Sequence, residues 1–291
     1  MYKTIDWDVV RRTVVKDGGL VIPDFLLAET VSQIDAELEP WRSQINFNDV
    51  FGSSIVGENR WIFHLGIASE TVLKLALHPT ILDFMETIFG EPPILAECSF
   101  QEKVSPSPHH LKMHTDADGG ILIFYYLSGV DDQLGSTRFL PETQDLDTPS
   151  QFVPEELYAS RMPQIREARG GPGTAFIFDQ DVWHDLPPVK KPGRRAVWCL
   201  YQPQSRPQGA VDHLYRQSFL AGLSERQRRA FGIGQPAFQR VGYLRNIGAP
   251  FNFAHAKTAL KYLLKFRKLG SQNSGHKKPP FARAPRIRAP L

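Results

Sequence analysis

A His-Thr-Asp triplet at His114 to Asp116 places the strongest constraint on how this chain can fold. Its imidazole and carboxylate are two residues apart, so on a β-strand both side chains leave by the same face and can bind one ion. A second imidazole for that ion must come from a distant strand. His184 meets this need, because it follows the β-branched and aromatic run 174–178, which a glycine-rich turn at 170–173 precedes.

Two imidazoles and one carboxylate form a ligand set that leaves several positions of an Fe(II) ion open on one face. An oxidisable co-substrate and O₂ can bind there side by side, so His114, Asp116 and His184 are candidate metal ligands of an oxygenase. The triplet alone is a weak signal, since a chain with nine His and 31 acidic residues contains one by chance about half of the time. The alternative for each histidine is an ordinary hydrogen-bonded core or surface residue. The ordered set favours the metal site, because each member lies beside a predicted strand.

A further strand is predicted at 195–201, where apolar and aromatic residues follow an arginine pair. Its first residue, Arg195, could direct a guanidinium into a barrel and hold a carboxylate with two parallel hydrogen bonds. His109 and His110 precede the triplet in a segment broken by prolines, so we expect surface or lid residues there rather than ligands.

The chain also resembles the phytanoyl-CoA hydroxylase-like branch of the Fe(II)/2-oxoglutarate-dependent oxygenases. Three stretches carry the likeness. Val14 to Leu26 is similar to the family's entry strand, 77–90 to the helix before its barrel, and 131–143 to a turn and strand inside the barrel. The resemblance covers roughly residues 12–205. The chain departs from the family at Pro141 to Gln144, where relatives have Pro-Gly-Ser-His.

The resemblance implies a mainly β fold with flanking helices, whose core is a double-stranded β-helix, a jelly roll of the cupin-like kind. It also implies Fe(II), 2-oxoglutarate as co-substrate and O₂, with a C–H bond of a small-molecule metabolite oxidised and succinate and CO₂ released. Hydroxylation is the reaction expected first, with desaturation and cyclisation as alternatives. Family spacing places the carboxylate-binding arginine eleven residues after the distal histidine, at Arg195, so Arg194 is expected to point outward.

The residue that makes the second contact to 2-oxoglutarate is assigned less directly than the arginine. Leu186 stands where several relatives carry a serine that helps to bind the co-substrate. Thr137 matches a threonine that contacts 2-oxoglutarate in some relatives, and we assign it this role. The alternative is a strand threonine on a half-buried face.

Length and composition predict one main domain over residues 1–250, since 291 residues with 42% hydrophobic content can bury a single large core. Amphipathic helices are predicted at 27–41 and at 69–89, the second broken by Pro79. No apolar run is long enough to cross a membrane, and no apolar signal region follows Met1, so a cytoplasmic location is the expectation. Two cysteines, Cys98 and Cys199, fall inside predicted strands and indicate a reducing compartment.

Charge is distributed unevenly along the chain. Of the 34 Lys and Arg residues, 15 follow Glu225, the last acidic residue, so residues 1–225 combine 19 basic with all 31 acidic side chains. Residues 251–269 contain a predicted basic amphipathic helix, and 270–291 form a basic tail with little to bury, predicted to be disordered. The helix either packs its leucines on the acidic barrel or meets an anionic membrane surface or an acidic carrier.

Two other function classes stay open. A jelly roll can serve as a non-catalytic binding protein, because a fold does not dictate a function. The basic tail suggests an oxygenase acting on nucleic acid, but the excess of acidic residues before Glu225 argues against it. The favoured partner is a small-molecule substrate.

Overall fold

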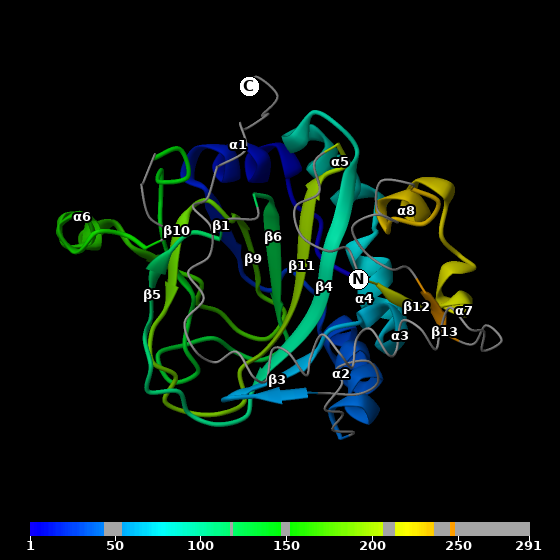
Figure 1. The fold of residues 1–291 in the computed structure, drawn as a ribbon, viewed down its shortest axis with the longest axis horizontal. Helices are drawn as coiled ribbons and strands as arrows, with labels where there is room; N and C mark the ends of the chain where they lie inside the picture. The colour runs from blue at the N-terminus through cyan, green and yellow to red at the C-terminus, as the bar shows by residue number, and fades with distance from the viewer. Residues whose placement is uncertain (44–53, 117–118, 147–151, 206–212, 236–244, 248–291) are drawn as a thin grey trace, which may run out of the picture.

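The computed structural model describes residues 1–43, 54–116, 119–146, 152–205, 213–235 and 245–247. Its strands form two antiparallel sheets that face each other and one short parallel pair (Figure 1). The larger sheet contains, in spatial order, β1 (Gly19–Ile22), β9 (Ala175–Asp179), β6 (Ile121–Tyr126), β11 (Arg195–Pro203), β4 (Pro93–Lys103), β3 (Asn59–Ile62) and β2 (Ser54–Val56). The smaller sheet contains β5 (Leu111–His114), β10 (Trp183–Leu186), β7 (Arg138–Leu140) and β8 (Arg166–Glu167). The parallel pair is β12 (Leu214–Arg216) with β13 (Arg245–Ile247).

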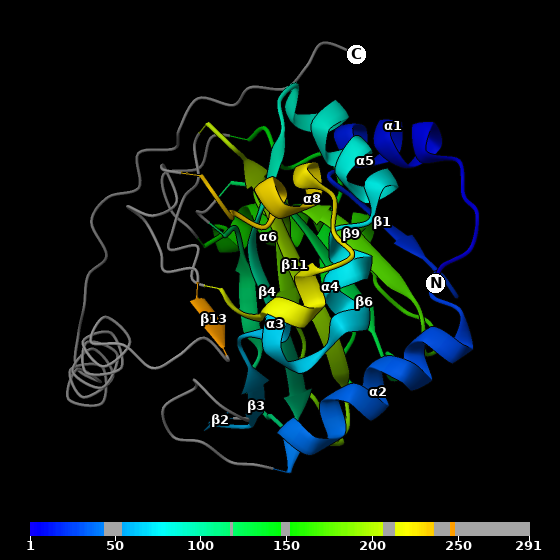
Figure 2. The same cartoon turned by 90° about the vertical axis from the view of Figure 1, so that its right-hand side faces the viewer.

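Most helices cover the outer face of the larger sheet, as Figure 2 shows. These helices are α1 (Trp7–Asp17), α2 (Ala28–Arg42), α3 (Leu65–Ala68), α4 (Glu70–Ala76), α5 (Pro79–Phe89), α7 (Gln217–Leu220) and α8 (Glu225–Ala230). The predicted helix 27–41 is confirmed as α2. The segment 69–89 divides at Pro79 as expected, because His78 caps α5 through its side chain and the proline takes the first helical turn, where no N–H is needed.

The larger sheet is buried on both faces. On β11, Val197, Cys199 and Tyr201 pack with the helices. Ala196 and Leu200 pack instead in the space between the two sheets, where Phe139 of the smaller sheet meets Phe176 at a ring-centroid distance of 5.1 Å. Two facing antiparallel sheets with helices on one outer face make a jelly roll, and the predicted fold class is therefore confirmed.

A smaller apolar cluster lies on the outer face of the smaller sheet. Met113, Leu140 and Trp183 are buried there under the insertion that contains α6 (Glu155–Arg161) and the short 3₁₀ helix η1 (Met162–Gln164). The insertion therefore buries the back of the strands that carry the histidines.

The segment 47–60 mixes Asn, Gly, Ser and aromatic residues without periodicity, which predicts a loop, but the structure differs at residues 54–62. They form the β2–β3 hairpin, which extends the larger sheet by pairing with β4. Backbone hydrogen bonds to a long neighbouring strand stabilise this edge even though its own sequence shows no alternation. The remainder of that loop, the predicted basic helix and the tail 270–291 lie outside the described residues.

Two further observations concern the cysteines and the length of the helices. Cys98 and Cys199 are free and buried, with their sulfur atoms 3.8 Å apart across β4 and β11. Among the helices described, none combines the length and the apolar character that crossing a membrane requires.

Candidate metal centre

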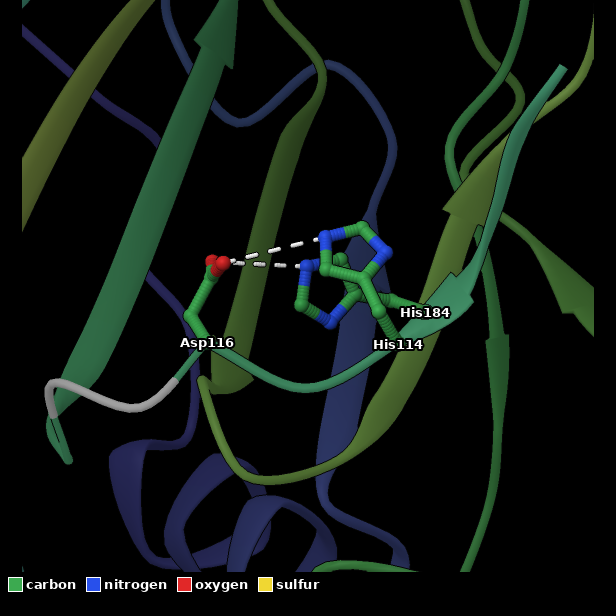
Figure 3. Close-up of side chains that lie close together, drawn as sticks. All are labelled: His114, Asp116 and His184. Carbon is green, nitrogen blue, oxygen red and sulfur yellow. Dashed lines mark ion pairs between the residues drawn. The ribbon is translucent and has the colours of Figure 1, made fainter. Parts of the chain in front are cut away.

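The three predicted ligands meet at one end of the smaller sheet. His114 is the last residue of β5 and pairs directly with His184 on the neighbouring strand β10. Asp116 lies just beyond the end of β5, where its backbone N–H donates to the carbonyl of Gln180 at 2.9 Å. Figure 3 shows both imidazoles pointing at the carboxylate of Asp116. The carboxylate thus reaches the site from the segment that follows β5 rather than from a continuous strand.

The donor atoms converge closely enough to bind one ion. The Nε2 atoms of His114 and His184 lie 3.7 and 3.4 Å from the carboxylate oxygens of Asp116 (Figure 3). One ligand atom from each residue lies within 4.8 Å of the other two. Within the described parts of the chain, no other group of His, Cys, Asp and Glu side chains converges in this way.

Hydrogen bonds to the backbone orient both imidazoles. Nδ1 of His114 lies 2.7 Å from the carbonyl oxygen of Lys112, and Nδ1 of His184 lies 2.9 Å from that of Val182. A carbonyl only accepts, so each Nδ1 carries the proton and each Nε2 offers its lone pair to the site. These residues therefore fit a divalent metal ion.

The protonation states also suit a metal. Burial and the neighbouring His184 lower the pKa of His114 and keep its imidazole neutral. Burial alone would raise the pKa of Asp116, but the polar groups around the carboxylate, first of all the imidazole of His184, lower it overall. A neutral imidazole and an ionised carboxylate are the forms that bind a cation.

His110 lies near the site but not in it. Its Nε2 lies 2.8 Å from Asp185, a fully buried carboxylate that also accepts two hydrogen bonds from Arg138. Asp185 follows His184 on β10 and faces the opposite side of the strand. His110 thus belongs to a charge network behind the metal centre, and His109 is exposed.

The orientation expected of the arginine pair is wrong. Arg195 faces the helices, where its guanidinium donates to Asp35 of α2 at 2.6 Å. Arg194 is 4% exposed and points into the space between the sheets. The reason is strand parity, because Arg194 shares its side of the chain with Ala196, which packs between the sheets.

Arg194 is part of a polar cluster inside the barrel. Its Nη2 donates to the hydroxyl of Thr137 at 3.2 Å, and its guanidinium lies 5.5 Å from the ring centroid of Tyr126. The hydroxyls of Tyr126 and Thr137 are 3.1 Å apart. Nε of Arg194 is buried without a hydrogen-bond partner, and no described carboxylate forms an ion pair with this side chain.

A second buried cation lies beside this cluster. Lys103 ends β4, and its backbone N–H donates to the carbonyl of Arg194 at 2.8 Å. Burial, together with the charge of Arg194, lowers the pKa of Lys103. Two buried basic side chains beside the hydroxyls of Thr137 and Tyr126 form a site suited to an anion. The alternation of side chains along β11 could have identified Arg194 as the residue that faces the smaller sheet. Hydropathy did not show which side that is, because both faces of β11 are apolar.

The anion-binding cluster and the metal centre share one face of the smaller sheet. Phe139 pairs with His184, and Thr137 precedes Phe139 by two residues on the same side of the chain. The two positions are therefore about 7 Å apart along the strand. A five-carbon dicarboxylate can bridge that separation.

Comparisons with known proteins agree with the fold. No family model matches the chain. A dioxygenase, swnH2 of Arthroderma benhamiae, is 22% identical over 211 residues, which cover 62% of this chain and 65% of that relative, just under two thirds of its length.

The solved structures that match the chain also have low sequence identity to it. HygX from Streptomyces hygroscopicus, with nickel, 2-oxoglutarate and hygromycin B bound, superposes with a TM-score of 0.55 at 16% identity, covering 69% of this chain and 89% of HygX. The non-heme α-ketoglutarate-dependent epimerase SnoN of nogalamycin biosynthesis gives 0.54 at 17% identity, covering 68% and 80%. At these identities the likeness establishes a shared fold, and membership of the phytanoyl-CoA hydroxylase-like branch stays a prediction.

Proposed function

We propose that this protein is an Fe(II)- and 2-oxoglutarate-dependent dioxygenase that hydroxylates a C–H bond of a small molecule. One observation carries the proposal. The donor atoms of His114, Asp116 and His184 lie within 4.8 Å of one another. The anion site of Arg194 and Thr137 is the next inward-facing position along the strand, because Thr137 precedes Phe139, the pairing partner of His184, by two residues. That juxtaposition is what a metal-chelating dicarboxylate requires. HygX with 2-oxoglutarate and SnoN with Fe³⁺ and α-ketoglutarate support it through their shared fold.

Each residue of the site has a role in this reaction. His114, Asp116 and His184 would hold the ion and leave its remaining positions on the inter-sheet side. Arg194 and Thr137 would bind and orient the distal carboxylate of 2-oxoglutarate. This corrects the assignment of Arg195 and retains that of Thr137. The buried ring of Phe178, whose centroid lies 5.1 Å from that of His184, helps to exclude bulk water.

The metal, once bound, supplies the activation of O₂. In the balanced reaction, 2-oxoglutarate loses CO₂ and becomes succinate, which takes one oxygen atom, and the substrate C–H becomes C–OH with the other. The protein itself fixes the geometry of the two oxidised partners.

The test is anaerobic addition of Fe(II) and 2-oxoglutarate, followed by admission of O₂ and measurement of succinate. We expect a visible charge-transfer band from the chelate in the wild type. His114→Ala, Asp116→Ala and His184→Ala should each lose the band and succinate formation, because removing one donor leaves an incomplete ligand set. His109→Ala, an exposed histidine nearby in sequence, is the matched control and should keep both. Undiminished turnover in Asp116→Ala, or no band in the wild type, would refute the proposal.

A further inference from the structure

The carboxylate of Asp116 is held differently from the two imidazoles of the metal centre. His114 and His184 lie on paired strands, are buried, and are oriented by backbone carbonyls. Asp116 lies beyond the end of β5, and its side chain is 35% exposed. Its own strand therefore does not fix the direction of the carboxylate, and a contact from another segment has to do so.

Gln180 supplies that contact. It lies in the turn between β9 and β10 and is 5% exposed. Its backbone carbonyl accepts from the N–H of Asp116 and its backbone N–H donates to the carbonyl of Gly120, both at 2.9 Å. Its side-chain Nε2 also donates to Oδ2 of Asp116 at 3.5 Å. Gln180 thus contacts both the main chain and the carboxylate of this ligand from a turn that is itself held by hydrogen bonds.

The side-chain amide of Gln180 is only half satisfied. Among the described residues, its Oε1 is buried without a hydrogen-bond partner. An unpaired buried oxygen costs free energy, and an apolar side chain of the same length would avoid that cost. The stability of the fold therefore does not account for an amide at this position. A neutral N–H donor beside the metal site does have a use, because it can orient a carboxylate without forming an ion pair that would compete with the cation.

We propose that Gln180 is a positioning residue, whose amide holds the Asp116 carboxylate toward His114 and His184 so that the three side chains are arranged for a metal ion before it binds. This inference rests on the proposed function, because it takes these three residues as the ligands of one ion. It requires neither 2-oxoglutarate nor O₂, so it can be tested with the metal alone.

The test is binding of Co(II) to the full-length protein, without 2-oxoglutarate, in competition with a coloured chelator. Gln180→Met keeps the length of the side chain and removes the N–H donor, while the backbone contact to Asp116 stays. We expect its Co(II) affinity to fall about tenfold, the lower end of the range for groups that orient a metal ligand, because the hydrogen bond is long. The visible Co(II) bands should also change, since their intensity depends on the number and arrangement of the ligands. Urea unfolding of the metal-free protein should show no loss of stability.

Two further variants separate positioning from a general effect of the substitution. Gln180→Asn keeps an amide but is one methylene shorter, so it should fall short of the carboxylate and bind Co(II) as weakly as Gln180→Met. Gln144 is the matched control, because it is also a buried glutamine with an unpartnered Oε1, but its Nε2 donates to the carbonyls of Val15 and Lys16 on α1. Gln144→Met should lose stability and keep the Co(II) affinity and spectrum of the wild type.

The outcomes separate this role from the oxygenase proposal. Wild-type Co(II) affinity and spectrum in both Gln180 variants would overturn the positioning role, as would an equal loss of affinity in Gln144→Met. If that happens while Fe(II) and 2-oxoglutarate give the charge-transfer band, the oxygenase proposal stands alone. If Co(II) affinity falls as expected in the Gln180 variants and the band is absent from the wild type, the positioning role stands and the oxygenase proposal fails.

Discussion

Arg194 and Arg195 are neighbours with opposite environments, because the side chains of adjacent residues leave a strand on opposite faces. Arg195 has a partner in Asp35 and is partly exposed, so it forms an ordinary ion pair at the edge of the helical layer. Arg194 is buried with hydroxyl contacts and an aromatic face but no described carboxylate partner. A buried charge without a counter-ion is costly, which favours the binding of an anion beside it.

Arg194→Ala should weaken 2-oxoglutarate binding by about 2–5 kcal/mol, because the distal carboxylate would lose a buried charge partner. Arg195→Ala should leave that affinity within about twofold and cost about 1 kcal/mol or less of stability, since its ion pair with Asp35 is solvent-screened. Titration of 2-oxoglutarate against the charge-transfer band measures the first effect, and urea unfolding the second. A larger loss of affinity in Arg195→Ala would contradict the inward assignment of Arg194.

At the scale of elements, a buried histidine contributes to the attachment of the layer of α7 and α8 to the outer face of β4. Nε2–H of His213 donates to the carbonyl of Leu95 on β4 at 2.7 Å. Its ring stacks on Phe231, the residue that ends α8, with centroids 4.6 Å apart. Burial in this apolar setting favours the neutral imidazole, and it therefore makes this layer sensitive to pH.

Burial lowers the pKa of His213 from 6.5 to about 4, with the hydrogen bond to Leu95 opposing the shift. Between these values the unfolded chain binds the proton and the folded protein does not, so stability falls as pH drops from about 6.5 toward 4. At pH 5 the loss should be about 2 kcal/mol relative to pH 7.5. Urea unfolding at the two pH values measures it. His213→Gln, which keeps an N–H donor, should lose this part of the pH dependence, whereas exposed His109→Gln should not; identical pH slopes in wild type and His213→Gln would contradict the assignment.

The whole molecule combines an acidic body with a strongly basic C-terminal quarter. All 31 acidic residues lie at or before Glu225, and 15 basic residues follow it. Opposite charges in one chain attract each other, which favours association of the basic segment 257–269 with the barrel over binding to an anionic surface. The competing interpretation is contact with an anionic membrane or an acidic carrier.

Truncation after Gly248 should decide between these interpretations. We expect the shortened protein to melt lower, by about 2–4 °C for each kcal/mol of lost packing. Full-length and shortened proteins should then co-sediment equally poorly with vesicles containing phosphatidylserine. Salt-sensitive vesicle binding that disappears on truncation, with an unchanged melting temperature, would favour the interfacial interpretation.

The sequence by itself predicted the helices at 27–41 and 69–89 and the set of three residues that converge at the candidate metal centre, whereas the fold class followed from the resemblance to a known family. The helices and the ligand set are local or periodic features. A residue spacing of two, a helical repeat and a proline at a helix start are all visible along one chain. His114, Asp116 and His184 could therefore be selected before any contact between their strands was known.

Only the tertiary structure decided which arginine faces the anion site. β11 is buried on both faces, so its hydropathy does not distinguish the side that faces the helices from the side that faces the smaller sheet. A shift of one residue exchanges the two sides, and pairing with β4 and β6 sets that register. The anion site likewise joins Arg194, Thr137 and Tyr126, whose proximity is a property of the fold and of no single segment.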